Sequence, residues 1–128
     1  MRWETPMTTD HEALVTRLWN QIWIDGELDL LAEVVHNPYI RHTREGTETT
    51  TPAAYARHLE SAVRTIRGTE VTINAMVTSG DMVFARLNMH GVNMETGNAV
   101  KLTWLAQYRI ADGRIAEAWT MHQPGLDW

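Results

Sequence analysis

The sequence predicts an α+β domain in which helices come first and an antiparallel sheet follows. As far as Gly68, apolar residues recur about every 3.6 positions, as they do along one face of a helix. After Gly68 the period is 2, and turn-forming sequences separate runs rich in Val, Thr, Ile, Trp and Tyr. Helices and strands do not alternate along the chain, which argues against a doubly wound parallel sheet.

Length and composition fit one folded domain. A chain of 128 residues can bury a core of its own, so we expect a single domain over residues 1–128 with an ordered core of about 8–124. The 44% hydrophobic and 21% charged residues are a globular balance. The absence of cysteine excludes disulfides, thiolate nucleophiles and cysteine-ligated metal sites.

Charge and hydropathy exclude several partners. The net charge is −5 and the 11 Lys and Arg residues are scattered, so we expect no nucleic-acid binding. No apolar run approaches the ~20 residues of a membrane span, and no signal-type stretch follows the first residues. We therefore expect no membrane contact and a cytoplasmic location. No phosphate-binding glycine loop is present, and no cofactor is expected.

The first predicted helix runs from about Thr9 to Asp25. Thr9 and Glu12 have the spacing of a capping box, and Gly26 is placed as a left-handed C-terminal cap. Its apolar stripe consists of Leu14, Val15, Leu18, Trp19, Ile22 and Trp23.

Three further segments precede the sheet. A short second helix carries residues 28–35 and is stopped by Asn37-Pro38, and residues 39–42 are extended. The polar, aperiodic run 44–51 predicts a loop. A third helix starts at Thr51-Pro52, carries Tyr55 on its apolar stripe and ends at Gly68.

The remaining sixty residues predict a four-stranded antiparallel meander. The turn signals that separate its strands are Ser79-Gly80-Asp81, Glu95-Thr96-Gly97-Asn98 and Asp112-Gly113.

Two local sequences resemble a known superfamily. They are Asn37-Pro38-Tyr39-Ile40-Arg41-His42, followed by Gly46, and Asp112-Gly113-Arg114-Ile115-Ala116-Glu117-Ala118-Trp119. Together with Thr96-Gly97, they resemble the SnoaL-like, polyketide cyclase-related domains of the NTF2-like superfamily, from about Asp10 to Gln123. The resemblance implies a cone in which three N-terminal helices pack on a strongly curved antiparallel sheet around a small-molecule pocket.

The resemblance does not determine the reaction, because the superfamily includes cyclases, isomerases, epoxide hydrolases, dehydratases and binding proteins. The base, tyrosine and acid of the steroid isomerases fall on His42, Trp19 and Ala106. The epoxide hydrolases resemble the chain at Arg86, but their carboxylates fall on Asn88 and Thr120. The Asp that follows the closing Trp in the cyclases is also replaced by Thr120.

Strand alternation gives a candidate pocket. If one set of alternate residues on each strand faces the concave side, His42 lies opposite polar side chains of the sheet, and aromatic side chains form the walls of the pocket. We expect His42, Arg86 and Asn88 to be catalytic and no metal to be bound. The expected substrate-binding residues are Trp19, Trp23, Tyr55, Phe84, His90, Leu102, Trp104, Thr120 and His122.

Each of these residues has a structural alternative. His42 is either a general base that titrates near neutrality or a structural histidine. Arg86 either contacts a ligand or pairs with Glu117 or Asp81. The two histidines near strand ends, His90 and His122, fit a solvated rim, and the tryptophans fit a core.

The pattern favours a small-molecule enzyme with an apolar pocket. His42 would supply acid/base chemistry of the isomerase, cyclase or dehydratase type next to a carbonyl, which Arg86 and Asn88 would polarise. The alternative is a non-catalytic binding or dimerisation module. We also expect a homodimer, since an outward set would otherwise face water. That set is Val83, Ala85, Leu87, Met89, Leu105, Trp119 and Met121.

Overall fold

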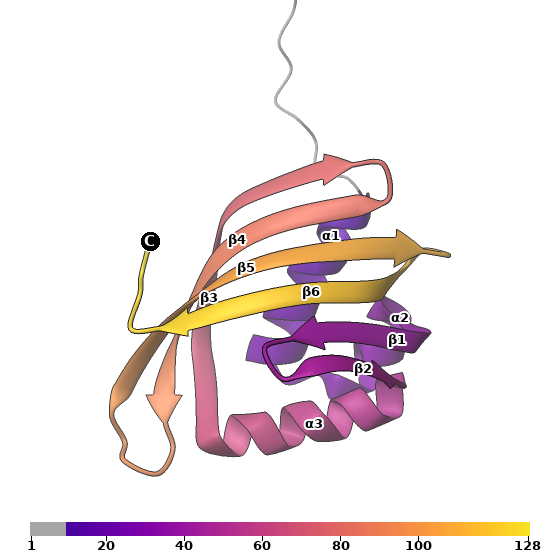
Figure 1. The fold of residues 1–128 in the computed structure, drawn as a ribbon. Helices are drawn as coiled ribbons and strands as arrows, with labels where there is room; N and C mark the ends of the chain where they lie inside the picture. The colour runs from indigo at the N-terminus through magenta and orange to yellow at the C-terminus, as the bar shows by residue number, and fades with distance from the viewer. Residues whose placement is uncertain (1–9) are drawn as a thin grey trace, which may run out of the picture.

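The helices lie on one face of a six-stranded sheet that curves around them (Figure 1). The structure, a computed structural model, describes residues 10–128. The helical elements are α1 (Asp10–Thr16), η1 (Arg17–Ile24), η2 (Leu28–Leu30), α2 (Leu31–Val34) and α3 (Pro52–Thr65). The strands are β1 (Val35–Thr43), β2 (Gly46–Thr50), β3 (Ile66–Ser79), β4 (Met82–Asn93), β5 (Ala99–Ala111) and β6 (Arg114–Pro124). The predicted α+β class, with three helical segments on a curved sheet, is confirmed.

The first helix changes its hydrogen-bonding pattern midway. α1 passes without a break into η1, which is a π-helix, so the two elements together form the predicted helix. Gly26 follows with φ of 73°, in the left-handed region that the predicted cap requires. Thr9, the other half of the predicted capping box, lies outside the described residues.

The segment predicted as a loop is mostly a strand. β2 pairs antiparallel with β1, with His42 opposite Thr47. The sequence predicts a loop here because an edge strand with no buried residue has no apolar alternation. Its four threonines are nevertheless residues that favour strands.

α3 starts where the sequence predicts and ends earlier. The Thr51 side chain accepts a hydrogen bond from the Ala54 N–H at 3.2 Å, as an N-cap does. The helix ends at Thr65, and Gly68 lies within β3 opposite Gly91. At Gly91 a Cβ atom would stand 2.4 Å from the carbonyl oxygen of Arg67, so this crossing of strands needs glycine.

The sheet has the order β2-β1-β6-β5-β4-β3. The pairs among β3, β4, β5 and β6 are all antiparallel, so the predicted meander is confirmed. β1 pairs in parallel with β6, so the β1–β2 hairpin forms the edge of the sheet next to β6.

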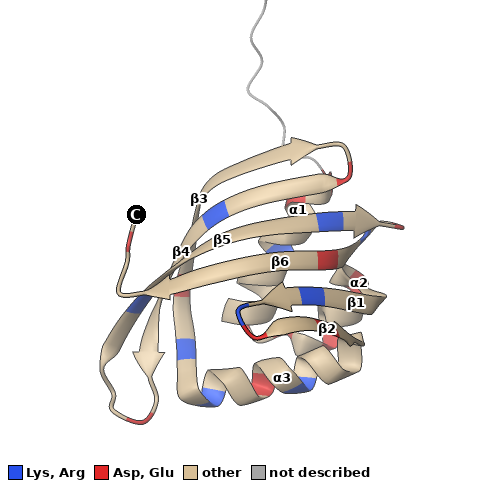
Figure 2. Ribbon diagram, in the orientation of Figure 1, with Lys and Arg blue, Asp and Glu red and all other residues tan. Residues whose placement is uncertain are grey.

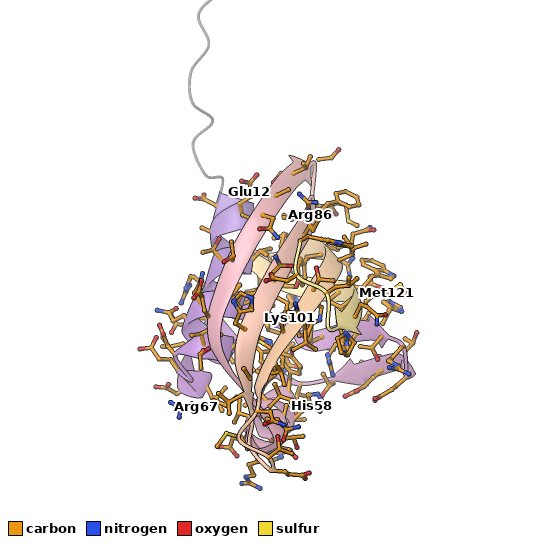
Figure 3. All side chains as sticks on the ribbon, turned by 90° about the vertical axis from the view of Figure 1, so that its left-hand side faces the viewer. Glu12, His58, Arg67, Arg86, Lys101 and Met121 are labelled. Atoms are coloured by element: carbon orange, nitrogen blue, oxygen red, sulfur yellow. The ribbon has the colours of Figure 1, made fainter. Side chains whose placement is uncertain are left out.

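The two faces of the sheet differ in what covers them. On the inner face, under the helices, Leu87 of β4 pairs with Trp104 of β5, and Trp104 pairs with His122 of β6. On the outer face, Arg86 pairs with Leu105 and Leu105 with Met121. Met121 and Glu12 of α1 accordingly lie on opposite sides of the sheet (Figure 3).

The parity predicted for β4 is therefore wrong. The inner face receives Val83, Ala85, Leu87 and Met89, all of which are buried in the core. Phe84, Arg86, Asn88 and His90 point the other way. The prediction assigned the polar set of alternating β4 residues to the pocket. A face that packs against helices instead takes the apolar set.

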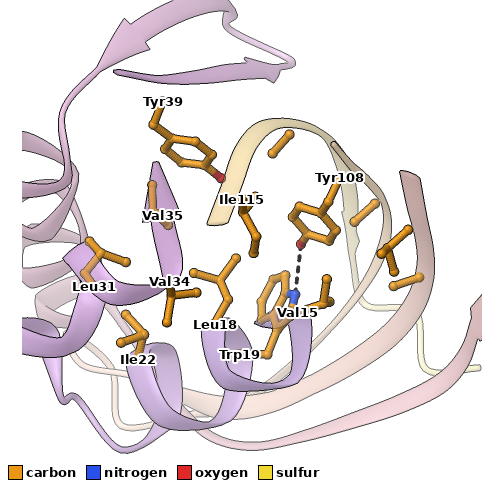
Figure 4. Close-up of a cluster of buried hydrophobic side chains, with 14 of the residues drawn as sticks. Val15, Leu18, Trp19, Ile22, Leu31, Val34, Val35, Tyr39, Tyr108 and Ile115 are labelled. Carbon is orange, nitrogen blue, oxygen red and sulfur yellow. Dashed lines mark hydrogen bonds between the residues drawn. The ribbon is translucent and has the colours of Figure 1, made fainter. Parts of the chain in front are cut away.

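A hydrogen bond inside the core ties the first helix to the sheet. Trp19 of η1 donates its Nε1–H to the hydroxyl of Tyr108 on β5 at 2.9 Å, and both side chains are buried (Figure 4). Val15, Leu18 and Ile22 pack beside Trp19, and Ile115 of β6 packs from the sheet. The bond satisfies two polar atoms that would otherwise be costly to bury.

Candidate functional site

A cavity of about 240 Å³ lies between the helices and the inner face of the sheet. η1 and α3 form one side, β5 and β6 form the other, and the β1–β2 hairpin lies at the mouth. Ala118 and Thr120 of β6 are small, so the sheet leaves space there. The lining residues are Leu18, Trp19, Trp23, Tyr39, Arg41, Thr43, Arg44, Glu45, Gly46, Thr47, Glu48, Tyr55, His58, Trp104, Tyr108, Ala118, Thr120 and His122.

Aromatic rings form a continuous wall of this inner cavity. Trp23 stacks on Trp19 with centroids 5.7 Å apart, and Trp19 meets the edge of Trp104 at 5.1 Å. Trp104 contacts the ring of His122 at 5.1 Å. Such a wall offers flat apolar surface that ends at one titratable group.

Three buried phenols lie beside the wall. Burial raises the pKa of Tyr39, Tyr55 and Tyr108, so all three hydroxyl groups remain protonated at neutral pH. The Tyr108 oxygen already accepts the bond from Trp19, and this leaves its own proton available for donation. Tyr108 is therefore a hydrogen-bond donor at the inner end of the cavity.

His122 lies at the open end of the cavity. Partial burial lowers the pKa of its imidazole below the usual 6.5, and the nearby Arg44 guanidinium lowers it further. At neutral pH the ring is therefore uncharged and can accept a proton. On the inner face, Thr120 lies between His122 and the position of Tyr108 along the paired strands.

The structure divides the predicted site residues between the two faces. The inner cavity brings together Trp19, Trp23, Tyr55, Trp104, Thr120 and His122. Leu102 packs against the core next to them. His42 and Arg86, together with Phe84, instead line a hollow of about 680 Å³ on the outer face. Their expected position across the concave pocket is therefore wrong.

His42 points outward because β1 alternates, with Tyr39 and Arg41 on the inner face. Its Nε2 is 2.6 Å from an oxygen of Glu117, and its Nδ1 is 2.8 Å from the Thr47 hydroxyl. Its ring stacks on Trp119 at 5.0 Å. Because both of its ring nitrogens have partners, His42 has the contacts expected of a structural histidine and not of a general base.

Glu117 is shared by two partners on the outer face. Arg109 donates its Nε–H to the second carboxylate oxygen at 3.0 Å. The hydrogen bond with His42 lowers the pKa of Glu117 most, and that with Arg109 lowers it too, against the opposing effect of burial. The structural alternative for Arg86, a pair with Glu117 or Asp81, is not formed within residues 10–128.

The β4 residues that were predicted to face the pocket, apart from Phe84, contact the C-terminal segment instead. Asn88 donates its Nδ2–H to the Trp128 carbonyl and accepts from the Trp128 N–H at 3.2 Å. His90 Nε2 is 3.0 Å from a carboxylate oxygen of Asp127. The Arg86 guanidinium lies over the Trp128 ring at 5.9 Å.

Sequence analysis missed Arg41, His58 and Tyr108 as cavity residues. Arg41 could have been found, because it alternates with His42 and so faces the opposite way. Tyr108 follows from the parity of Trp104 and Ala106 on the same strand. His58 has no such signal, since it depends on how α3 is rotated against the sheet.

The described part of the chain shows no group of three or more His, Asp or Glu side chains placed to hold a metal ion. In the same range, none of the helices is both long and apolar enough to cross a membrane.

Comparisons with known proteins agree with this fold. A family model described as SnoaL-like polyketide cyclase matches residues 13–123. None of the curated proteins is significantly similar in sequence.

Solved structures superpose over most of the chain. A candidate polyketide cyclase from Acidithiobacillus ferrooxidans has a TM-score of 0.84 at 14% identity, covering 93% of this chain and 92% of that one. IdmH from Streptomyces antibioticus, a candidate polyketide cyclase, has a TM-score of 0.75 at 21% identity, covering 90% and 93%. An LEH-like epoxide hydrolase from M. tuberculosis has a TM-score of 0.76 at 15% identity, covering 92% of this chain and 86% of that one.

The contacts of His42 predict a pH-dependent effect on stability. We expect His42→Ala to lower the free energy of unfolding by roughly 1–2 kcal/mol at neutral pH, because Glu117 loses a hydrogen-bond partner. The lowered pKa of Glu117 stabilises the fold above the ordinary value of 4.5, and this is lost as pH falls through the lowered value. Urea unfolding from pH 3 to pH 7 should therefore show the difference shrinking below about pH 4.5.

His90→Ala is the control, because its pair with Asp127 is more exposed and should cost less. A His42→Ala protein as stable as wild type at pH 7 would contradict the structural role.

Proposed function

This chain belongs to the SnoaL-like polyketide cyclase family, and from that premise we propose that it is an enzyme acting on a small carbonyl compound in the inner cavity. The chemistry is proton transfer next to the carbonyl, of the isomerase, cyclase or dehydratase type. The observation that carries the proposal is a neutral histidine and a protonated phenol at the ends of one aromatic cavity. Family membership and the epoxide hydrolase-like neighbour support small-molecule chemistry in general.

In this proposal His122 is the base and Tyr108 the hydrogen-bond donor. His122 removes a proton from the carbon next to the carbonyl, the electron pair of that C–H bond forms a C=C bond, and the π pair of the carbonyl moves to its oxygen. Tyr108 donates a hydrogen bond to this oxygen as its negative charge develops. His122 then returns the proton to another carbon of the enolate system, or the enolate carbon attacks a second carbonyl, whose oxygen receives the proton from His122.

The role expected of His42, Arg86 and Asn88 passes to these two residues. Those three side chains are on the outer face, and two of them are held by Glu117 and the C-terminal segment. β5 and β6 place no carboxylate in the cavity, and Thr120 stands where the family's cyclases carry an Asp; the two glutamates that line the cavity, Glu45 and Glu48, belong to the β1–β2 hairpin at its mouth. A histidine replaces the missing carboxylate without needing deep burial.

The proposal predicts a loss of proton transfer in His122→Asn. The probe is 2-tetralone, a two-ring ketone whose exchange of α-protons in deuterium oxide is followed by NMR. We expect His122→Asn to lower the catalysed exchange roughly 10²-fold, and Tyr108→Phe to lower it as well. Since the pKa of His122 is lowered, wild-type activity should persist below pH 6.5 before it falls.

His90→Asn is the matched control, because His90 is on the outer face, and it should keep the wild-type rate. Unchanged exchange in His122→Asn would contradict the proposal. Binding of 2-tetralone without any catalysed exchange would identify the alternative, a binding module.

We also propose that the outer face joins two copies of the chain. Val77, Phe84, Leu105 and Met121 are 62%, 44%, 52% and 72% exposed there. No helix within residues 10–128 covers this face, and the central parts of β5 and β6 carry no charge (Figures 1 and 2). A two-fold axis would bring the same apolar patch of each copy together.

The surface differs from the one that the sequence predicts. Val83, Leu87 and Met89 are buried in the core and cannot contribute, and Ala85 borders the outer hollow but is only 6% exposed. Leu105, Trp119 and Met121 remain, and Phe84 and Val77 join them. The C-terminal residues cover Asn88 and leave this patch open.

The dimer proposal predicts that Met121→Glu produces monomers. Light scattering coupled to size exclusion at micromolar concentration should give twice the chain mass for wild type and the single mass for the variant, because two buried carboxylates would oppose each other. Ser61→Glu, on the exposed side of α3, is the control and should remain dimeric. A monomeric wild type would overturn the proposal.

A further inference from the structure

Arg41 is a cation at the mouth of the inner cavity with little access to water. Its side chain is 14% exposed, and its guanidinium carbon lies 4.6 Å from the centre of the Tyr55 ring. Burying a charge is costly unless a partner of opposite charge compensates it. Among the described residues, its ion-pair partner is Glu48.

Glu48 compensates Arg41 weakly. The closest nitrogen and oxygen are 3.6 Å apart, which is longer than a hydrogen bond, and the Glu48 side chain is 57% exposed. The Tyr55 ring lies against the guanidinium, and Arg41 also hydrogen-bonds to the Tyr55 side chain, but this neutral phenol brings no negative charge to compensate the cation. Arg41 is therefore positioned but incompletely paired.

The cavity limits the size and shape of a ligand. Its volume of about 240 Å³ falls below the roughly 300–1,000 Å³ of pockets that hold drug-sized ligands. The stacked rings of Trp19 and Trp23 lie 17° from parallel and offer a flat surface. One or two fused rings fit such a space, and larger polycyclic systems do not.

The charges at the mouth favour a single negative charge. Arg41, Arg44, Glu45 and Glu48 all line the cavity, and their formal charges cancel. A monoanion can replace Glu48 as the partner of Arg41, whereas a dianion would be opposed by both glutamates. The planar guanidinium matches the two oxygens of a carboxylate.

We propose that the inner cavity recognises a compact planar carboxylic acid, an aromatic or conjugated carboxylate of one or two rings, with its carboxylate paired to Arg41. This inference rests on the proposed function for its site and adds the substrate class. Arg41 is the specificity residue. The ring system lies against the tryptophan wall, and His122 and Tyr108 can reach the remaining carbon atoms and any carbonyl group of the ligand.

The test compares ligands that differ in one feature. Isothermal titration measures the binding of 2-naphthoate, of the neutral 2-naphthamide with the same ring system, and of 9-anthroate with one more ring. Wild type should bind the acid about tenfold or more tightly than the amide, since a hydrogen bond between charged groups exceeds a neutral one. It should bind 9-anthroate at least tenfold more weakly than 2-naphthoate.

Variants assign the preference to Arg41. Arg41→Gln should bind acid and amide equally, Arg41→Lys should keep part of the preference, and Arg64→Gln on the exposed surface of α3 should keep all of it. Melting temperatures verify that each variant is folded. Equal losses for both ligands in Arg41→Gln would show a purely structural role and overturn the inference.

The outcomes separate this inference from the proposed function. A wild-type protein that binds acid and amide equally overturns the inference even if Arg41→Gln fails to fold, and it leaves proton exchange by His122 unaffected. Preference for the acid without any catalysed exchange supports the inference and contradicts the proposed reaction. Tight binding of 9-anthroate overturns the size limit.

Discussion

The contact between the first helix and the inner face of the sheet, closed by the hydrogen bond from Trp19 to Tyr108, decides where the other functional side chains lie. Because the helix covers one face of the sheet, β4 must present its apolar parity to that face. Strand pairing then transmits the choice to β5, β6 and β1. His122 and Arg41 are thereby turned inward, and His42 and Arg86 outward.

Two faces of one sheet therefore carry two sets of polar groups with different properties. On the outer face, His42 and Arg109 both bond to Glu117, and these contacts lower the pKa of that carboxyl group. On the inner face, His122 has its pKa lowered by burial, with no carboxylate hydrogen-bonded to it in the described residues. The first set is held by contacts within the fold, while the second lines the cavity in which we propose that a ligand binds. The position in the sheet, more than the residue type, distinguishes the two histidines.

The helices, the meander and its turns follow from the sequence because each depends on local periodicity and on residues such as Gly26, Pro52 and Gly113. β2 does not, since an exposed polar edge strand carries no apolar alternation. The aromatic half of the site was predictable from large apolar residues such as Trp19 and Trp104. Of the polar residues, Thr120 and His122 were predicted correctly, whereas Arg86, Asn88 and His90 of β4 were assigned to the wrong face, because assigning β4 to a face requires knowing what covers it. Arg86 resembles the epoxide hydrolases at its position in the chain, and Asn88 stands where they carry a carboxylate, yet both side chains contact the C-terminal segment instead.

We propose that ligands enter the inner cavity and leave the outer hollow unoccupied. The most direct measurement follows the indole N–H resonances of the tryptophans by heteronuclear NMR while 2-naphthoate is added. We expect the resonances of Trp19, Trp23 and Trp104, which line the cavity, to shift with one saturating affinity, and that of Trp119 on the outer face to stay unchanged. A shift confined to Trp119 would place the ligand on the outer face and rule out binding in the inner cavity.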